Sequence, residues 1–174
     1  MAYQASQLMG PGVLLMTPPG HEPLPNRILD DGITVSTVNP FAHSALVVGE
    51  PGHLTMIEAL WRVTESPLDK YEATGWYYPL TLSATQSRVL EAAAFSKMGQ
   101  LYGASQIWES FLRDDVHIDI HPRLDPHHLD CSGLLCWICR QAGIRLTYAP
   151  VPSPADISYS PLLPGPRPWD HLAS

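Results

Sequence analysis

Residues 130–143 read DCSGLLCWICRQAG, and this segment decides the fold more than any other part of the chain. After its first residues the segment is mainly apolar, and Gly143 stands where a helix commonly ends. The pattern predicts a helix over residues 131–142. Cys136 and Cys139 lie deep in this helix among leucine, tryptophan and isoleucine. We therefore expect them to pack as small buried hydrophobic residues.

Cys131 stands in the first turn of this predicted helix, where a thiol can be activated. A thiol attacks a carbonyl only as its thiolate, and both the positive end of a helix dipole and a nearby imidazolium stabilise that anion. Ser132 and Gly133 are small and leave room for a substrate carbonyl, while backbone N–H groups at a helix start can bind an oxyanion. The local pattern also fits three cysteines that serve only in packing.

Several short apolar runs precede the helical part of the chain and predict a sheet. HSALVV at residues 43–48 and LTMIEAL at residues 54–60 are separated by a Gly- and Pro-containing turn, which predicts a β-hairpin. The run at residues 13–16, VLLM, predicts another strand. GWYYPLTL, at residues 75–82, predicts a strand at a sheet edge or one that ends near Pro79.

Helical periodicity begins after the last of these runs. Ser83 and Gln86 form the pattern of a capping box, which predicts a helix over residues 84–98. We expect a second helix over residues 105–113, and one or two helical turns at residues 26–31.

The C-terminal part combines a predicted strand at residues 144–148 with a Pro-rich arm. Seven of the 18 prolines fall in residues 150–174, which excludes a long helix or a central strand there. Leu162, Leu163 and Trp169 favour an arm that lies on the domain. The order of strands, helices and a final strand predicts an α+β fold, with a single domain over residues 1–174.

His43 and Glu58 are polar residues at conspicuous positions of the predicted hairpin. His43 opens an apolar strand, where an imidazole costs free energy unless it has a partner. Glu58 is the one charged residue of the facing run. We expect the two to lie opposite each other, so that the carboxylate fixes the tautomer of the ring and holds it toward the thiol. The pattern also fits an edge-strand histidine and an outward-facing glutamate.

Composition excludes several classes of function. The chain has 174 residues, a net charge of -7, two lysines and eight arginines, so nucleic acid is disfavoured as a partner. No apolar run approaches the roughly 18 residues of a membrane span. The start, MAYQASQLMG, lacks the features of a signal peptide, and the C-x4-C-x2-C spacing is not a secreted disulfide framework. We therefore expect no integral membrane segment and a cytoplasmic or phage-borne protein.

A zinc site is one alternative for the region around the predicted cysteine helix. Four histidines and the three cysteines lie within 23 residues, and zinc binds such ligands. The histidines are His117, His121, His127 and His128. Zinc-binding cysteine pairs usually stand on a tight knuckle, whereas Cys136 and Cys139 are predicted inside an apolar helix. We therefore expect no metal and no cofactor.

Taken together, these residues resemble the NlpC/P60 superfamily of papain-like cysteine hydrolases. The resemblance is to its circularly permuted branch, which includes YiiX-type and poxvirus-type proteins and is related to lecithin:retinol acyltransferase. In the ordinary branch the nucleophile helix precedes the histidine strand, and here the order is reversed. The matching segments, in chain order, are Gly12-Val13-Leu14-Leu15, His43 to Gly49, Ile57-Glu58-Ala59, Gly99-Gln100-Leu101-Tyr102, Asp130-Cys131-Ser132-Gly133-Leu134, Ala142-Gly143-Ile144, Pro154-Ala155-Asp156-Ile157 and Ser160-Pro161-Leu162. The chain departs from the pattern at Val13, where the family has aspartate, and at Ala45, where it has glycine.

The resemblance implies a permuted papain-like fold, with an antiparallel sheet packed on helices and the nucleophile at a helix N-terminus. It implies a cysteine hydrolase that cleaves an amide bond through a thioester acyl-enzyme, acting on a small peptide or a cell-wall-derived, peptidoglycan-type substrate. The implied catalytic residues are Cys131, His43 and Glu58. The residues implied for oxyanion or substrate binding are Tyr102, Ser132 and Asp130.

Two other functions remain open on the same fold. Permuted members include lipid acyltransferases and thioesterases, but a lipid enzyme would use an apolar patch or anchor, and this chain has no span and few basic residues for anionic lipid. The other alternative is a non-catalytic zinc or binding module. The presence of both the cysteine and the histidine favours an enzyme.

Overall fold

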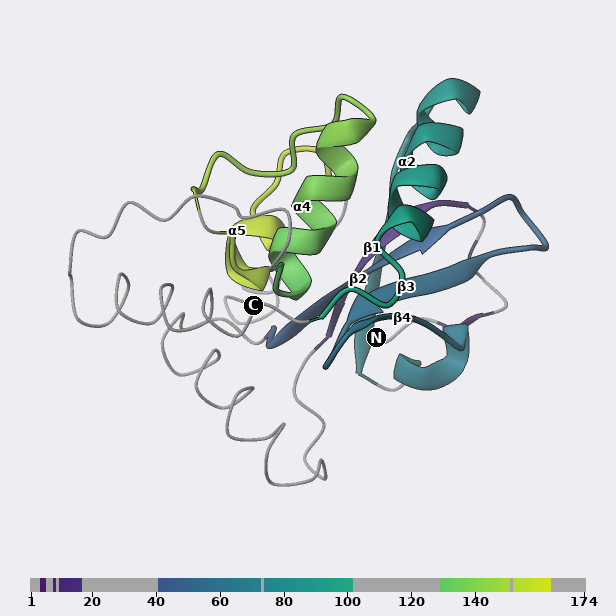
Figure 1. The fold of residues 1–174 in the computed structure, drawn as a ribbon, viewed down its shortest axis with the longest axis horizontal. Coiled ribbons are helices and arrows are strands. Elements are labelled where there is room, and N and C mark those ends of the chain that lie inside the picture. Colours follow the sequence, from purple (N-terminus) through teal and green to yellow (C-terminus); the bar gives the residue numbers. More distant parts are fainter. Residues whose placement is uncertain are drawn as a thin grey trace, which may run out of the picture.

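The computed structural model describes residues 4–5, 8, 10–16, 41–72, 74–101, 129–150 and 152–163, and these form a five-stranded antiparallel sheet with helices. The strands are β1 (Gly12–Met16), β2 (His43–Val48), β3 (Thr55–Ala59), β4 (Val63–Ser66) and β5 (Gly75–Pro79). Their order across the sheet is β4-β3-β2-β1-β5, so the predicted hairpin of β2 and β3 is confirmed (Figure 1).

Two features of the sheet test the predictions for its edges. β5 is an edge strand that ends at Pro79, as predicted, because proline has no N–H to offer a further ladder position. β4 was not predicted as a separate strand. With four residues, VTES, of which only Val63 is a large apolar residue, it carries too little alternation to be recognised.

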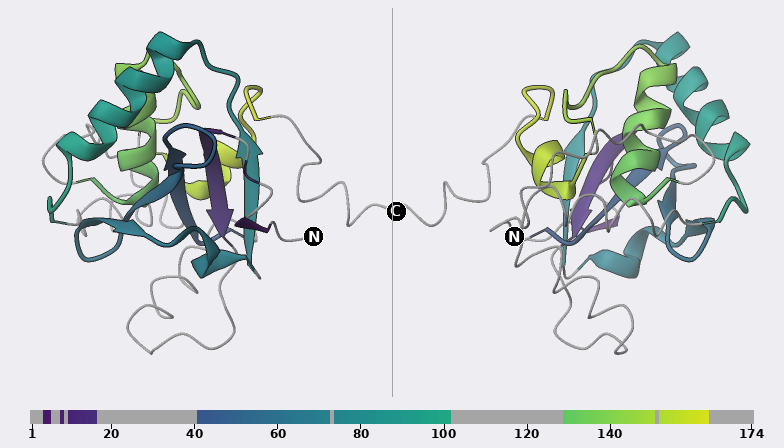
Figure 2. Two further views of the ribbon diagram at one scale, coloured as in Figure 1. Left: turned by 90° about the vertical axis from the view of Figure 1, so that its right-hand side faces the viewer. Right: turned by 60° about the vertical axis from the view of Figure 1, so that its left-hand side comes forward.

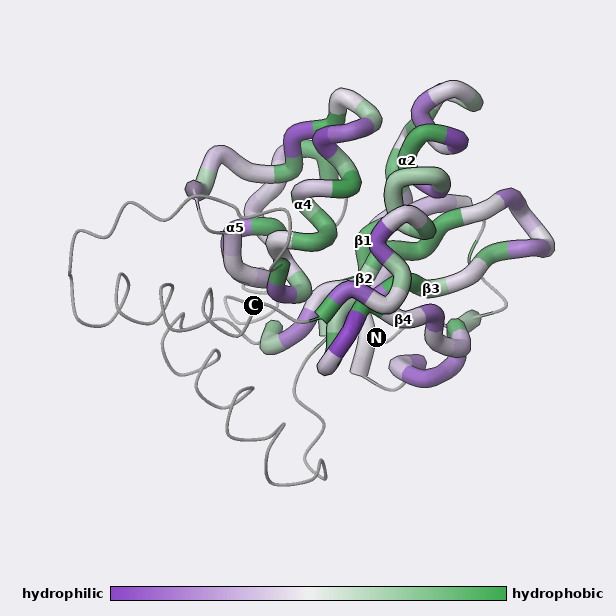
Figure 3. Tube along the Cα trace, in the orientation of Figure 1, coloured by the Kyte–Doolittle hydropathy of each residue, from purple (hydrophilic) through white to green (hydrophobic). Residues whose placement is uncertain are grey.

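Two helices cover one face of the sheet. α2 (Ala84–Ser96) and α4 (Cys131–Gln141) pack against each other, and both contact β2, with α4 also on β3 (Figures 1 and 2). The core between them includes alternate strand residues such as Val13, Leu46 and Ile57. In Figure 3 the hydrophobic colour is concentrated in α4 and the central strands, whereas the turn between β2 and β3 is hydrophilic.

The opposite face of the sheet has its own smaller core. Leu14, Ala45, Val47 and Met56 point to this face, where they pack with Tyr71. Tyr71 belongs to a short 3-10 helix, η2 (Leu68–Tyr71), which follows β4 directly after Pro67. This small helix therefore brings polar side chains to the far side of β3, away from α4.

The helix ends follow the predicted signals. Ser83 and Gln86 form the predicted capping box at the start of α2. α4 begins at Cys131, as predicted, and Gly143 follows its end with a φ of 73°, in the left-handed region that glycine tolerates. The helices predicted at residues 26–31 and 105–113 lie outside the described residues.

The predicted strand at residues 144–148 is wrong. Ile144 and Leu146 are buried in the core on the helical side of the sheet, so apolar and polar residues do alternate in burial there. The segment nevertheless pairs with no strand of the described structure, in which β4 and β5 form the two sheet edges. Further on, α5 (Pro154–Ser158) is a five-residue helix whose Ile157 enters the same core, within the segment predicted as an arm.

Candidate functional site

Cys131 is the first residue of α4, and its neighbours define the start of that helix. The Asp130 carboxylate accepts a hydrogen bond from the Gly133 N–H at 2.5 Å, and the Asp130 carbonyl accepts one from the Leu134 N–H at 2.8 Å. The N–H groups of Cys131 and Ser132 have no acceptor among the described residues. The thiol therefore lies at the positive end of an eleven-residue helix, beside backbone donors that no described residue accepts from.

His43 and Glu58 are in contact, although not in the arrangement predicted. Glu58 lies opposite Ala45 in the ladder between β2 and β3, so its contact with His43 is diagonal. The offset is two residues, which leaves both side chains on the same face of the sheet. His43 Nε2 lies 2.9 Å from Glu58 Oε2.

His43 also interacts electrostatically with Cys131. Burial lowers the pKa of His43, but the charge and hydrogen bond of Cys131, together with those of Glu58, raise it to about 10. Because Nε2 bonds to Glu58, Nδ1 is the ring nitrogen that remains for the thiol. His43 is the first residue of β2, so its ring lies at the end of the sheet, where it reaches both β3 and the start of α4.

Glu58 is fully buried, with 0% of its side chain exposed, and four described side chains donate to it. Oε2 accepts from His43 and from the Tyr71 hydroxyl at 3.0 Å. Oε1 accepts from Lys70 Nζ at 2.6 Å and from the Ser66 hydroxyl. Burial raises the pKa of Glu58, but its contacts with His43, Lys70 and Ser66 lower it to about 2. The carboxylate is therefore ionised at neutral pH.

Three of the residues that donate to Glu58 were not predicted from the sequence: Ser66, Lys70 and Tyr71. All three come from β4 and η2, and the short β4 had not been recognised, so the turn that returns these residues to β3 was not foreseen. One signal was available in the composition. The chain has only two lysines, and one of them follows the hairpin closely in sequence.

The residues predicted for oxyanion or substrate binding fall into different positions. The Ser132 hydroxyl is buried 3.3 Å from the Ser44 hydroxyl of β2, and Asp130 caps α4. Burial raises the pKa of Asp130 to about 6, against the opposing effects of the Gly133 N–H and the charge of His43. Both side chains thus form hydrogen bonds within the protein, and their role toward a substrate stays a prediction. Tyr102 lies outside the described residues.

Cys136 and Cys139 are buried free thiols, as predicted. Burial raises the pKa of Cys136, and it raises the pKa of Cys139 to about 12. Neither therefore shares the environment of Cys131, whose thiol interacts electrostatically with His43.

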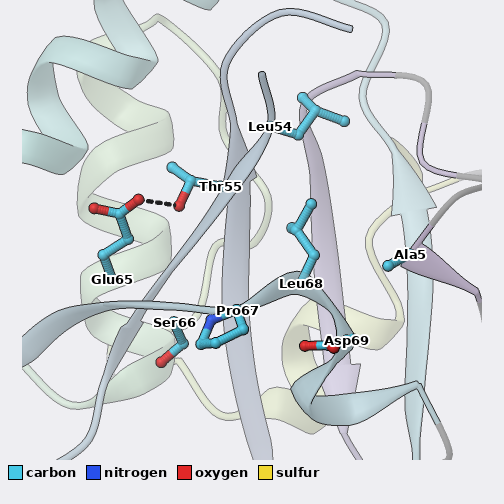
Figure 4. Close-up of a pocket in the computed structure, with 8 residues that line it drawn as sticks. All are labelled: Ala5, Leu54, Thr55, Glu65, Ser66, Pro67, Leu68 and Asp69. Atoms are coloured by element: carbon cyan, nitrogen blue, oxygen red, sulfur yellow. Dashed lines mark hydrogen bonds between the residues drawn. The ribbon is translucent and has the colours of Figure 1, made fainter. Parts of the chain in front are cut away.

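A hollow of about 590 Å³ lies beside β4 and η2, separate from Cys131 (Figure 4). Its lining residues include Leu54, Glu65, Ser66 and Leu68, and Figure 4 shows the hydrogen bond from Thr55 to Glu65 at its side. Ser66 connects this hollow to the site, because its hydroxyl donates to Glu58.

The described residues contain no group of three His, Cys, Asp or Glu side chains that could hold a metal ion. The four loop histidines of the zinc alternative lie outside the described residues. Among the helices that the structure describes, none has the length and apolar character needed to cross a membrane.

Comparison with known proteins shows similarity in fold. No protein-family profile matches the chain, and no curated protein sequence matches it. A crystal structure described as the metalloprotein YiiX from Escherichia coli O157:H7, DUF1105, has a TM-score of 0.62 and 15% sequence identity. The similarity covers 90% of this chain and 94% of that chain. The chain therefore has an α+β, YiiX-like fold.

Proposed function

We propose that this chain is a cysteine hydrolase that cleaves an amide bond with Cys131, His43 and Glu58, in the manner of a circularly permuted NlpC/P60 enzyme. The observation that carries the proposal is the position of the His43 ring. One nitrogen lies 2.9 Å from a buried carboxylate, and the ring also interacts electrostatically with a thiol at a helix start. A nucleophile, a base and a group that orients the base thus interact in sequence, as in a catalytic triad.

The chain order supports the permuted form of this family. His43 opens β2, and Glu58 follows on the neighbouring strand, β3. Cys131 comes only afterwards, at the start of α4. The YiiX-like fold agrees with the same branch, since YiiX-type proteins are among those that the sequence resembles.

The reaction proceeds in two halves. The Cys131 thiolate bonds to the carbonyl carbon of the substrate. The carbonyl oxygen then develops a negative charge that the N–H groups of Cys131 and Ser132 stabilise. The C–N bond then breaks, and the His43 imidazolium gives its proton to the leaving amine, which leaves a thioester. His43 next takes a proton from water, which attacks the thioester. The C–S bond breaks, and the acid product leaves with the thiolate–imidazolium pair restored.

Glu58 positions His43 throughout these steps. Its contact at Nε2 directs Nδ1 toward Cys131 and stabilises the imidazolium form. Replacing this carboxylate would therefore impair the reaction through the orientation and charge of the ring.

The YiiX structure is described as a metalloprotein, and a metal is not part of this proposal. Every step above is assigned to the chain's own side chains and to water.

Iodoacetamide alkylation of the native protein tests the proposal. At about pH 6 an ordinary thiol is under about 1% thiolate, whereas a thiol held by an imidazolium is mainly ionised. The lower intrinsic nucleophilicity of such a thiolate offsets part of this gain, so Cys131 should react about tenfold faster than glutathione. Cys131→Ala should abolish the labelling, and His43→Ala should reduce its rate to that of glutathione.

The acyl-enzyme can be trapped with p-nitrophenyl acetate. We expect one acetyl group per chain by intact-mass spectrometry, placed on Cys131 by peptide mapping and absent from Cys131→Ala. If wild-type Cys131 reacts no faster than glutathione, and His43→Ala does not change its rate, the hydrolase proposal is wrong.

A further inference from the structure

Lys70 makes a direct contact with the acidic member of the candidate site. Its ammonium lies 2.6 Å from Glu58 Oε1, on the carboxylate oxygen that His43 does not use. Glu58 therefore lies between two basic groups, one on each oxygen. Removing an ammonium from a buried carboxylate changes the proton affinity of every group nearby.

The surroundings hold Lys70 in this position. Its Nζ lies 4.8 Å from the centre of the Tyr71 ring, a cation–π contact, and the Tyr71 hydroxyl donates to the same carboxylate. Tyr71 also lies against the His43 ring, with the two ring centres 6.1 Å apart. η2 thus places the Lys70 ammonium and the Tyr71 hydroxyl next to Glu58, on the face of the sheet opposite α4.

We propose that Lys70 is a positioning residue that keeps Glu58 ionised and bonded to His43, and so extends to lower pH the range in which the Cys131–His43 ion pair exists. This inference rests on the proposed function, and it adds a fourth residue to Cys131, His43 and Glu58. Lys70 touches no reacting atom and acts through Glu58.

Charge balance gives the physical reason. With the thiolate, imidazolium, carboxylate and ammonium present, the site has two negative and two positive charges. Within the part of the chain that the structure describes, the other titratable groups that face it are Asp130 at the start of α4, which interacts with the charge of His43, and Tyr71 on η2. Loss of the Lys70 charge leaves an excess negative charge, which favours protonation of Glu58. A protonated Glu58 no longer stabilises the His43 imidazolium, so we expect the acid limb of thiol reactivity to move to higher pH.

The expected shift is about 1 pH unit. Removing an opposite charge at this distance changes a pKa by roughly 1–3 units, and the lower end applies because water reaches the partly exposed ammonium. Lys70 exposes 34% of its side chain, whereas Glu58 exposes none.

The test measures the rate of iodoacetamide alkylation of Cys131 against pH in several full-length variants. Lys70→Met should shift the acid limb up by about 1 pH unit, and Lys70→Gln, which keeps a donor without the charge, should do the same. Lys70→Arg should restore the wild-type profile. Lys97→Met is the matched control, because Lys97 is the only other lysine and lies over the Trp137 ring at the end of α2. Circular dichroism confirms that each variant is folded.

A second readout separates this inference from the hydrolase proposal. In Cys131→Ala protein, ¹³C NMR of the Glu58 carboxyl group should show a titration midpoint that rises by about 1 pH unit when Lys70 is replaced by methionine. If wild-type Cys131 is labelled no faster than glutathione but the NMR shift is observed, the hydrolase proposal is wrong, whereas the effect of Lys70 on the ionisation of Glu58 is supported. Fast wild-type labelling with unshifted profiles in folded Lys70→Met and Lys70→Gln would overturn the role of Lys70 alone.

Discussion

Glu58→Gln is the substitution that most directly tests the buried centre of this site. Each carboxylate oxygen accepts from two donors, His43 and Tyr71 on one and Lys70 and Ser66 on the other. A glutamine amide has one acceptor oxygen and one NH₂ donor. If the NH₂ faces Lys70, two donors oppose each other. If it faces His43, Nε2 must become the acceptor, and the ring then directs a neutral Nδ1–H at the thiol.

The magnitude follows from burial and charge. Removing one partner of a buried ion pair costs about 3–5 kcal/mol, since the remaining charge has lost its counter-ion. Here the remaining charges keep partial access to water, with 15% of the His43 and 34% of the Lys70 side chain exposed. We therefore discount the cost and expect Glu58→Gln to lower the free energy of unfolding by about 2–3 kcal/mol at about pH 6.

The pH dependence has a definite sign. The pKa of Glu58 is lowered from 4.5 to about 2, so its stabilising contribution is complete above pH 4.5 and is lost as the pH falls toward about 2. The difference in stability between wild type and Glu58→Gln should therefore shrink over that range. Glu65→Gln, on the neighbouring strand and exposed, is the matched control and should change stability by less than about 0.5 kcal/mol.

Urea denaturation followed by tryptophan fluorescence measures this difference. The reasoning fails if Glu58→Gln is within about 0.5 kcal/mol of wild type at about pH 6, or if the difference stays constant as the pH is lowered.

Two further predictions concern the sheet and the other thiols. Gly12→Ala would place a Cβ 2.3 Å from a Tyr77 ring carbon and should cost about 1–3 kcal/mol in urea denaturation, whereas Gly10→Ala, with nothing within 4 Å, should match wild type; equal stability of the two variants would contradict the close approach of β1 and β5. Cys136 and Cys139 should resist iodoacetamide in the native protein and react after unfolding in urea, because burial raises the pKa of both thiols. Mass spectrometry checks this, and native labelling of either at the rate of Cys131 would contradict it.

Much of the fold was predictable because its signals are local. The strands β1, β2, β3 and β5 each contain a run of apolar residues with Gly or Pro near at least one end, and α2 starts at a capping box that the structure contains. The start of α4 was equally clear, because small and polar residues precede an apolar run that ends at a glycine. The strand predicted at residues 144–148 failed for a complementary reason. Alternation reports which side chains are buried, whereas a strand also needs a partner for its backbone.

The candidate site was predictable only in part, because its members meet through tertiary contacts. His43 and Glu58 were identified by their charge or polarity within apolar strands, which is a local property. Lys70 and Tyr71 have no such signal, since they stand in a polar segment where such residues are ordinary. Their role depends on β4, which turns the chain back along β3 and places η2 beside Glu58.

The contact between His43 and Glu58 was found despite an error in the predicted pairing, and the geometry of the sheet explains why. Side chains alternate between faces, so an offset of two residues preserves the face while an offset of one reverses it. The actual partner of Glu58 in the ladder is Ala45, which lies on the same face as His43. The ring two residues along β2 therefore stays within reach of the carboxylate, with 2.9 Å between His43 Nε2 and Glu58 Oε2.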